Sequence, residues 1–212
     1  MKKIIQYKTL IIGSSSFIGR HLSSIYREHL ILTYYKNKIK NGIKFDILKD
    51  NISSILEQNN VKQVILIGGV INFNTIKKNY QYAKSINVDN MSRIINDIIS
   101  YGAKVIYFSS ESVFDGKIGD YKETYTPLPK FIYGEQKYQI EQYIKLKTNN
   151  YLIFRISKVF SSDPIDNTFI TNWLKQLLNN ETILIAQDNI LTPIHINDCV
   201  MIIMKLIKNE EQ

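Results

Sequence analysis

A serine, a tyrosine and a lysine in the middle of the chain have the types and order of a carbonyl-reducing site. Tyr133 and Lys137 stand four positions apart, so they share one face of a helix. An ammonium near a phenol favours the ionised phenol, whose ordinary pKa is about 10. A tyrosine tuned in this way can exchange a proton with an alcohol or a ketone. Ser110 follows an apolar run and can hold the same substrate oxygen by a hydrogen bond.

The spacing of Tyr133 and Lys137 is not decisive alone, because solvated helix pairs have it too and the chain holds 14 tyrosines. The order of the motifs favours catalysis. A loop that begins and ends with glycine, residues 13–19, comes first. A serine pair follows a later apolar run, and Tyr133 and Lys137 lie at the start of the next helical segment. We therefore predict hydride transfer with a nicotinamide cofactor.

The N-terminal region contains a candidate dinucleotide loop. The apolar run 10–12 leads into Gly-Ser-Ser-Ser-Phe-Ile-Gly at residues 13–19, where helical periodicity begins. Such a loop needs glycine for its tight turn and for close helix packing, and small residues so that backbone N–H groups approach the pyrophosphate. Ser16 replaces the usual central glycine, and its hydroxyl can donate to a phosphate. A strand-to-helix turn without a ligand is the alternative. The predicted contacts are Gly13, Ser15, Ser16, Phe17, Ile18 and Gly19.

The end of the second apolar run bears on the choice of cofactor. It carries lysines where a site for NAD has an acidic residue on the ribose hydroxyls. Lys36 or Lys38, beside Tyr34, can pair with a 2′-phosphate, so we expect NADP(H) to be favoured over NAD(H). Lysines at a strand end are also often simply solvated. Asp46 and Ile47 can contact the adenine, although Asp46 also fits a helix cap.

Apolar runs of strand length alternate with amphipathic segments along most of the chain. This alternation predicts an α/β fold, a Rossmann-type doubly wound parallel sheet. The predicted strands are 9–12, 29–34, a short one before Phe45, 61–67, 103–108 and 151–156, and the predicted helices are 17–26, 76–100 and 133–147.

Two regions are expected within this single structural unit. Residues 1–156 would form the dinucleotide-binding domain, and residues 157–212 a short substrate cap packed on it. The cap would hold a helix at 169–178, a strand at 183–186 and a last helix from about Asn197.

Composition restricts the class of protein. The net charge is +8, but the lysines are scattered, which argues against nucleic-acid binding. The single Cys199 offers neither a disulfide framework nor a cysteine metal site, and the three histidines lack metal spacing, so no metal is expected. No apolar run approaches the roughly 20 residues that span a bilayer, and residues 1–8 lack a signal-peptide core. We expect a cytoplasmic protein that does not bind membranes.

Together these motifs resemble the extended short-chain dehydrogenase/reductase superfamily, and within it the dTDP-4-dehydrorhamnose reductase group. Residues 109–116, Ser-Ser-Glu-Ser-Val-Phe-Asp-Gly, are similar to that group's Ser-Thr-Asp-Tyr-Val-Phe-Asp-Gly. The resemblance implies that Ser110, Tyr133 and Lys137 are catalytic. It also implies cofactor contacts at Gly68, Gly69, Asn87, Ser109, Tyr133, Lys137 and Ile156, and substrate contacts at Ser110, Glu111, Ser112 and Lys158.

The same resemblance separates the reaction types. Ser112 stands where related dehydratases carry a second carboxylate, so elimination lacks its acid or base. We expect an NADP-dependent reductase of a nucleotide-activated 4-keto sugar, in the biosynthesis of surface polysaccharide sugars. A nucleotide-sugar epimerase and a non-catalytic dinucleotide-binding regulatory subunit stay open. The short region after Asp198 fits a smaller substrate, a truncated chain, or a pocket completed by a partner subunit or in a homodimer.

Overall fold

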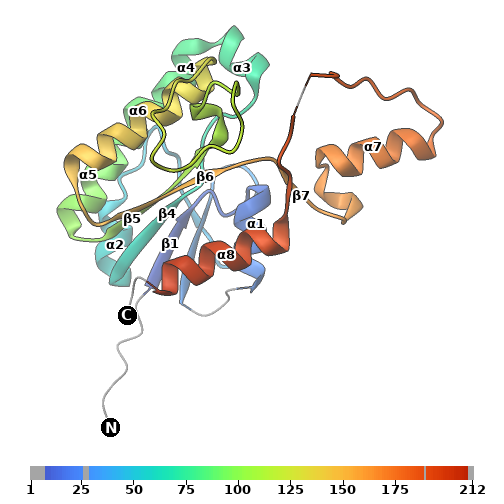
Figure 1. Cartoon of the computed structure of the whole chain (residues 1–212). Helices are drawn as coiled ribbons and strands as arrows, with labels where there is room; N and C mark the ends of the chain where they lie inside the picture. Colours follow the sequence, from blue (N-terminus) through green and yellow to red (C-terminus); the bar gives the residue numbers. More distant parts are fainter. Residues whose placement is uncertain (1–7, 26–28, 189, 210–212) are drawn as a thin grey trace. The chain divides into compact units, whose positions relative to one another are not determined.

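The computed structural model describes residues 8–25, 29–188 and 190–209 (Figure 1). Residues 1–7, part of the segment 1–8 for which no signal peptide was predicted, lie outside the described residues. The last residue of the predicted helix 17–26 lies outside them too. The chain forms two compact units, residues 1–155 and 156–212.

The first unit is built on one six-stranded sheet, with the order β3-β2-β1-β4-β5-β6. Strands β1 and β2, β1 and β4, β2 and β3, and β4 and β5 pair in parallel. From β1 the chain adds strands toward one edge of the sheet, and from β4 toward the other edge. Doubly wound sheets bind ligands at this switch point between β1 and β4. The predicted fold class is confirmed, and each strand predicted before residue 157 is present, the longer ones within two residues of their expected bounds. The strands are β1 (Lys8–Ile12), β2 (Leu30–Tyr34), β3 (Ile43–Lys44), β4 (Val61–Leu66), β5 (Lys104–Ser110) and β6 (Tyr151–Ile156).

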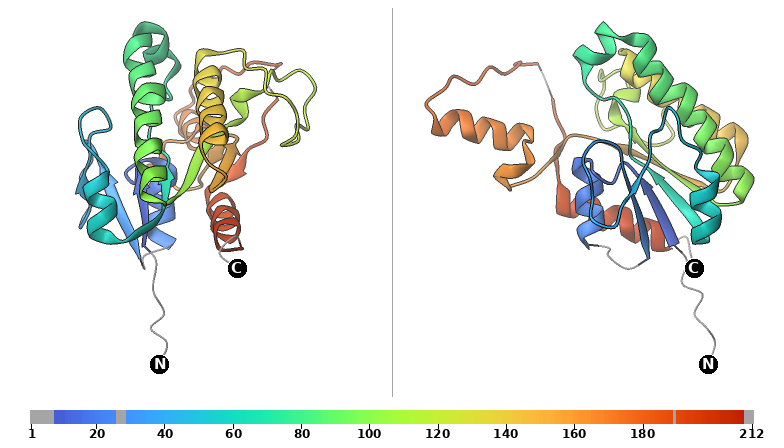
Figure 2. Two further views of the ribbon diagram at one scale, coloured as in Figure 1. Left: turned by 90° about the vertical axis from the view of Figure 1, so that its left-hand side faces the viewer. Right: turned by 180° about the vertical axis from the view of Figure 1, so that it is seen from behind.

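Helices cover both faces of this sheet. Figure 2 shows α1 (Phe17–Ile25) on one face, and α5 (Met91–Tyr101) and α6 (Ile132–Lys147) on the other. This split follows from right-handed crossovers that run in opposite directions from β1 and β4. A short helix that the sequence did not suggest, α2 (Ser53–Asn59), precedes β4.

The prediction of one helix over 76–100 is wrong. The segment forms α3 (Phe73–Lys78), α4 (Tyr80–Lys84), a π-helical turn η1 (Ser85–Asn90) and then α5. Asn79 breaks it, because its backbone leaves the helical region (φ −137°, ψ 68°) and its side chain accepts a hydrogen bond from the N–H of Tyr82. A side chain that caps a new helix in this way competes with continuation of the old one.

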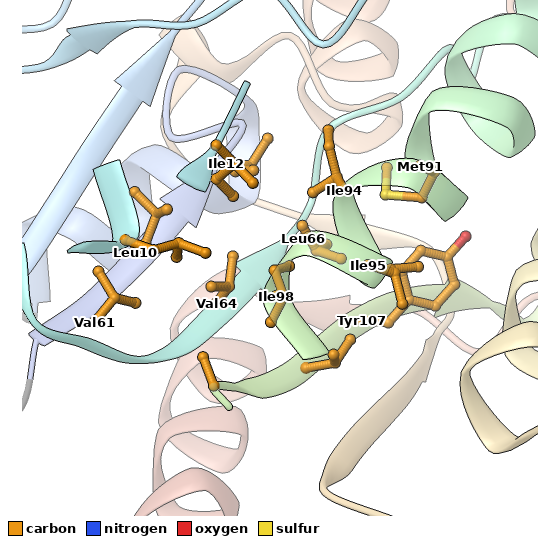
Figure 3. Packing of buried hydrophobic residues seen from close by; sticks show 14 of the residues in the cluster. Leu10, Ile12, Val61, Val64, Leu66, Met91, Ile94, Ile95, Ile98 and Tyr107 are labelled. Atoms are coloured by element: carbon orange, nitrogen blue, oxygen red, sulfur yellow. The ribbon is translucent and has the colours of Figure 1, made fainter. Parts of the chain in front are cut away.

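The core between sheet and helices fixes the strand ends. In Figure 3, Met91, Ile94, Ile95 and Ile98 of α5 lie against side chains of β4 and β5. Each is at most 1% exposed, and burying such a side chain contributes roughly 1.5–3 kcal/mol. This packing holds the ends of β4 and β5 in place, and both ends carry predicted site residues.

The second unit contains a two-stranded parallel sheet, β7 (Val159–Phe160) with β8 (Ile194–His195). Helix α7 (Phe169–Leu178) has the predicted bounds, and α8 (Ile196–Asn209) begins one residue before the predicted start. The predicted strand 183–186 is wrong. Leu184 and Ile185 are 90% and 65% exposed, and a short apolar run without a neighbouring strand does not form a sheet. None of the described helices is both long and apolar enough to cross a membrane.

Candidate active site

The loop after β1 lies tightly against the loop after β4. Gly13 has a φ of +96°, and a β-carbon there would come within 2.7 Å of the backbone nitrogen of Gly68. A β-carbon on Gly19 would collide with the carbonyl oxygen of Gly13. Glycine is therefore required at both ends of the loop, as the dinucleotide motif predicted. The backbone of this loop therefore lies at the switch point between β1 and β4.

Ser16 caps helix α1. Its Oγ accepts a hydrogen bond from the N–H of Gly19 at 3.1 Å, and its N–H donates to the carbonyl of Gly13 at 3.0 Å. The N–H groups of Phe17 and Ile18 stand in the first helical turn, where a helix offers no partner of its own. Together with the positive end of the helix they suit a pyrophosphate. Ser15 is half-buried in the same loop.

Thr33, a residue that the sequence reasoning missed, supports this loop from β2. Its Oγ1 donates to the carbonyl of Ile11 at 2.9 Å and accepts a long 3.4 Å bond from the N–H of Gly13. Ser14 completes the support, because its Oγ accepts from the N–H of Thr33 at 3.1 Å. A small polar residue within an apolar run was the only signal for Thr33.

The residues expected near the adenosine lie at the end of β2 and in the turn after β3. Tyr34 is half-buried, while Lys36 is exposed and its Nζ lies 5.7 Å from the centre of the Tyr35 ring. Asp46 accepts a 3.0 Å bond from the N–H of Leu48, so its carboxylate holds its own turn. The carbonyl of Ile47 accepts a 3.0 Å bond from Arg93 of α5. This turn is therefore held by hydrogen bonds from within and from α5, and Lys36 lies at the surface.

Asn87 clamps the loop after β4 from the π-helical turn. Its Oδ1 accepts from the N–H of Val70 at 2.8 Å, and its Nδ2 donates to the carbonyl of Val70 at 2.9 Å and to Oε1 of Gln136 at 2.8 Å. A β-carbon on Gly69 would lie 2.9 Å from this Oδ1, which explains the glycine. Irregular π-helical turns are frequent at functional sites.

Lys137 is buried beneath the end of β5. Its Nζ donates to the carbonyl oxygen of Phe108 at 2.8 Å. The ammonium also lies 4.7 Å from the centre of the Tyr107 ring and 5.8 Å from that of Tyr133. Burial lowers the pKa of Lys137 to about 8, so this side chain is cationic at neutral pH. The predicted neighbourhood of Tyr133 and Lys137 is thus present on one face of α6.

Tyr133 is held in the protonated form of its phenol. Burial raises the pKa of Tyr133 to about 12, and the negative charge of Glu111 adds to the effect. The next residue, Gly134, allows α6 to lie close to the turn after β5, because a β-carbon there would collide with the carbonyl oxygen of Ser112. The expectation that Lys137 favours the ionised phenol is therefore wrong for the chain by itself. A protonated phenol suits a proton donor.

Ser110 ends β5 and begins a 3₁₀ turn, η2 (Glu111–Val113). Its Oγ accepts a 3.1 Å bond from the N–H of Ser112, and its hydroxyl lies 3.1 Å from Oγ of Ser112 and 3.4 Å from Oε2 of Glu111. The three predicted substrate contacts of this segment therefore gather at one turn. These local bonds use the hydroxyl proton of Ser110 within the turn, so the hydroxyl has to rotate away from Ser112 and Glu111 before it can donate to a substrate.

A buried ion pair lies under this turn, and the sequence reasoning assigned no role to it. Ser109 donates a 2.5 Å hydrogen bond to Glu141, which is fully buried on α6. Arg155 of β6 pairs with the same carboxylate through Nη2 at 2.7 Å and Nε at 3.0 Å. The only signal was the position of Glu141, four residues after Lys137 on the same helix face.

Two predicted contacts belong to the second unit. Ile156 is half-buried, and Lys158 is exposed while its carbonyl accepts a 2.9 Å bond from the N–H of Ile194. Their contacts to cofactor and substrate stay predictions. No group of three or more histidine, cysteine, aspartate or glutamate side chains with metal-binding geometry occurs in the described part of the chain.

Comparison with known proteins places these features in a family. The family described as the RmlD substrate binding domain matches residues 7–212. The chain belongs to this family. The resemblance to extended short-chain dehydrogenase/reductases is thereby confirmed, and with it the class of NAD(P)-dependent oxidoreductases of that type.

Proteins similar to this RmlD-family chain include dTDP-4-dehydrorhamnose reductases. It is 23% identical over 205 residues to the dTDP-4-dehydrorhamnose reductase of Aggregatibacter actinomycetemcomitans, which covers 94% of the chain and 67% of that protein. The dTDP-4-dehydrorhamnose reductase of Bacillus anthracis, solved with NADP, has a TM-score of 0.82 at 25% identity, covering 96% of this chain and 71% of the other.

An epimerase shares the fold of this RmlD-family chain. A mutant UDP-glucuronic acid 4-epimerase of Bacillus cereus, solved with NAD and a fluorinated UDP-sugar, has a TM-score of 0.83 at 19% identity, covering 95% of this chain and 73% of the other.

Proposed function

We propose that this chain is an NADP-dependent reductase of a nucleotide-activated 4-keto sugar, as part of surface polysaccharide sugar biosynthesis. One observation carries the proposal: the buried Lys137 ammonium, fixed on the carbonyl of Phe108, lies beside a protonated Tyr133 on the helix that packs against the Ser110 turn. This arrangement suits protonation of a carbonyl oxygen at neutral pH.

Each side chain has a defined role in the proposed reaction. Ser110 donates a hydrogen bond to the substrate carbonyl oxygen, and Tyr133 donates the phenolic proton to that oxygen as the carbonyl becomes an alcohol. The phenolate left on Tyr133 is stabilised by the ammonium of Lys137. The dinucleotide supplies the hydride when bound. It would be held by the 13–19 loop, the N–H groups of Phe17 and Ile18, and the 68–69 loop.

Reduction is favoured over epimerisation by the segment Val-Phe-Asp-Gly at 113–116, which matches the reductase group. The relative from Bacillus anthracis carries NADP, and Lys36 and Lys38 offer cations for a 2′-phosphate. The nucleotide-sugar substrate, the NADP preference and association into a homodimer or with a partner subunit are all parts of this proposal.

The first test is binding. The purified chain is titrated with NADPH and with NADH, and the quenching of its tryptophan and tyrosine fluorescence is followed. NADPH is expected to bind at least tenfold more tightly than NADH. Failure of both to bind would overturn the proposal at its first step.

The second test is turnover with a dTDP-4-keto-6-deoxy sugar and NADPH. Tyr133→Phe is expected to lose 10²–10⁴-fold in kcat while NADPH affinity is retained. Tyr138→Phe, on the same helix, is the matched control and is expected to stay active. Tight NAD⁺ binding with interconversion of UDP-sugars would indicate an epimerase, and binding without any turnover a regulatory subunit.

A further inference from the structure

Glu141 is a buried carboxylate at the junction of three elements. It lies on α6 with no solvent exposure, and it accepts hydrogen bonds from Ser109 at the end of β5 and from Arg155 in β6. The Arg155 bond is bidentate, through Nε and Nη2, so the plane of the carboxylate is fixed. A buried charge this constrained costs desolvation energy, which can offset what the ion pair contributes to stability.

The position of Glu141 relates it to the proposed reaction. It lies one helical turn after Lys137 on the same buried face of α6. The Lys137 ammonium contacts a neutral carbonyl, that of Phe108, and the rings of Tyr107 and Tyr133. The Glu141 carboxylate raises the pKa of Lys137 against the larger effect of burial.

We propose that Glu141 is a positioning residue of the reductase site, whose fixed carboxylate is the buried counter-charge for the Lys137 ammonium and joins the catalytic helix to the serine strand. Through Ser109 it holds the residue before Ser110. Through Lys137 it acts on the phenol of Tyr133. The reading of this role as catalytic support rests on the proposed function.

Arg155 limits how strongly Glu141 attracts Lys137. It neutralises the carboxylate from the β6 side, and its guanidinium lies 4.9 Å from the centre of the Phe114 ring. Its Nη1 also donates to the carbonyl of Glu123 at 3.3 Å. Contacts with the segment after Ser110 therefore hold Arg155 in its ion pair with Glu141. Because Glu141 is paired with Arg155, the Lys137 ammonium faces Tyr133.

The experiment measures Lys137 directly. Lysine labelled with ¹³C at Cε is incorporated into the full chain, Lys137 is assigned from a Lys137→Met sample, and its titration is followed by NMR. The groups that face this ammonium are Tyr107, Tyr133, Glu141 and, beyond the carboxylate, Arg155. For the unaltered chain the midpoint is expected at about 8.

Two single variants are expected to move this midpoint in opposite directions. Glu141→Gln keeps the size and one of the two accepting oxygens but removes the charge, so the Lys137 midpoint falls by about one pH unit. Arg155→Met leaves the carboxylate without its neutralising partner, so the midpoint rises. Both variants break the same ion pair, so a purely structural role would shift both in the same direction or leave both unchanged, and either result would overturn the proposal.

A double variant guards against misfolding. Glu141→Gln with Arg155→Met removes both buried charges at similar volume, a change that proteins often tolerate. Its Lys137 midpoint is expected to fall as in Glu141→Gln; an unchanged midpoint would overturn the proposal. The titration needs neither cofactor nor substrate, so it stands even if the reductase function fails. Where turnover is present, the high-pH loss of kcat is expected to move down with the Lys137 midpoint in Glu141→Gln.

Discussion

The Nζ of Lys137 lies 2.8 Å from the carbonyl oxygen of Phe108, two residues before Ser110 on β5. This hydrogen bond joins the helix that carries the proposed proton donor to the strand that carries the proposed carbonyl ligand. The aromatic rings of Tyr107 and Tyr133 lie near the same ammonium. Changes at Lys137 are therefore expected to act on chemistry and on geometry together.

Lys137→Met is predicted to lower kcat about 10²–10⁴-fold, because the phenolate of Tyr133 loses its stabilising cation. The folded chain is expected to persist, since removing a buried cation also removes its desolvation cost. Steady-state kinetics and thermal unfolding check both parts. Lys145→Met, on the exposed end of the same helix, is the control and is expected to change neither. Full activity of Lys137→Met would contradict the assigned role.

The stability of the chain is predicted to rise with pH between about 8 and 10.5 through Lys137. Its pKa is lowered from 10.5 to about 8 by burial, so in this interval the unfolded chain binds more protons than the folded one. The contribution is on the order of 3 kcal/mol over the whole interval. Denaturant unfolding of the unaltered chain and of Lys137→Met isolates it, because only the former should show this slope. Parallel pH curves for the two would contradict the prediction.

Gly134→Ala is predicted to lower activity at least about 10²-fold, because its methyl group would collide with the carbonyl of Ser112. The collision moves α6 away from the Ser110 turn, and a misplacement of about 1 Å can cost that much in rate. Glu135→Ala, exposed at the next position of the helix, is the matched control. Equal kcat values for the two variants would show that the helix tolerates the displacement.

Asn87→Ala is predicted to weaken NADPH binding and to destabilise the fold by roughly 1–3 kcal/mol. It leaves the backbone N–H and carbonyl of Val70 without their partner, next to Gly69 in the proposed cofactor loop. Fluorescence titration and denaturant unfolding measure the two effects. Asn90→Ala, in the same π-helical turn, removes bonds that do not reach Val70 and should leave NADPH affinity within threefold.

Lys36→Glu is predicted to reduce the preference for NADPH over NADH by tenfold or more. The exposed lysine at the end of β2 would lose its attraction for a 2′-phosphate, and a carboxylate there suits the free ribose hydroxyls of NADH. Lys40→Glu changes the net charge equally at another exposed position and controls for the general field. An unchanged ratio of the two dissociation constants would place the 2′-phosphate elsewhere.

Sequence periodicity was sufficient for the strands of the sheet and for α6, because buried parallel strands and amphipathic helices have distinct patterns. It failed at Asn79, where one capping side chain divides a region that is apolar at helical spacing throughout. It also failed at Leu184 and Ile185, because an apolar run becomes a strand only if another strand is beside it.

For the proposed site, too, residues with a local sequence pattern could be predicted and residues that depend on distant contacts could not. The glycines of the 13–19 loop and the pair Tyr133 and Lys137 have local signatures, and they could be predicted. The contributions of Thr33 and Glu141 depend on residues 20 and 32 positions away, to which no local pattern points. The contact of Ser16 with a phosphate stays a prediction, and its role as a helix cap was not predicted.

The π-helical turn at Ser85–Asn90 makes the position of Asn87 depend on the number of residues in this segment. A π-helical turn is an α-helical turn with one residue inserted. Deleting that residue would let the helix become regular, and the side chains before the deletion would rotate by roughly 100° relative to those after it. Asn87 would then turn away from Val70 although every residue type that it needs is still present. A chain that lacks one residue in this segment is therefore expected to lack the contact between Asn87 and Val70.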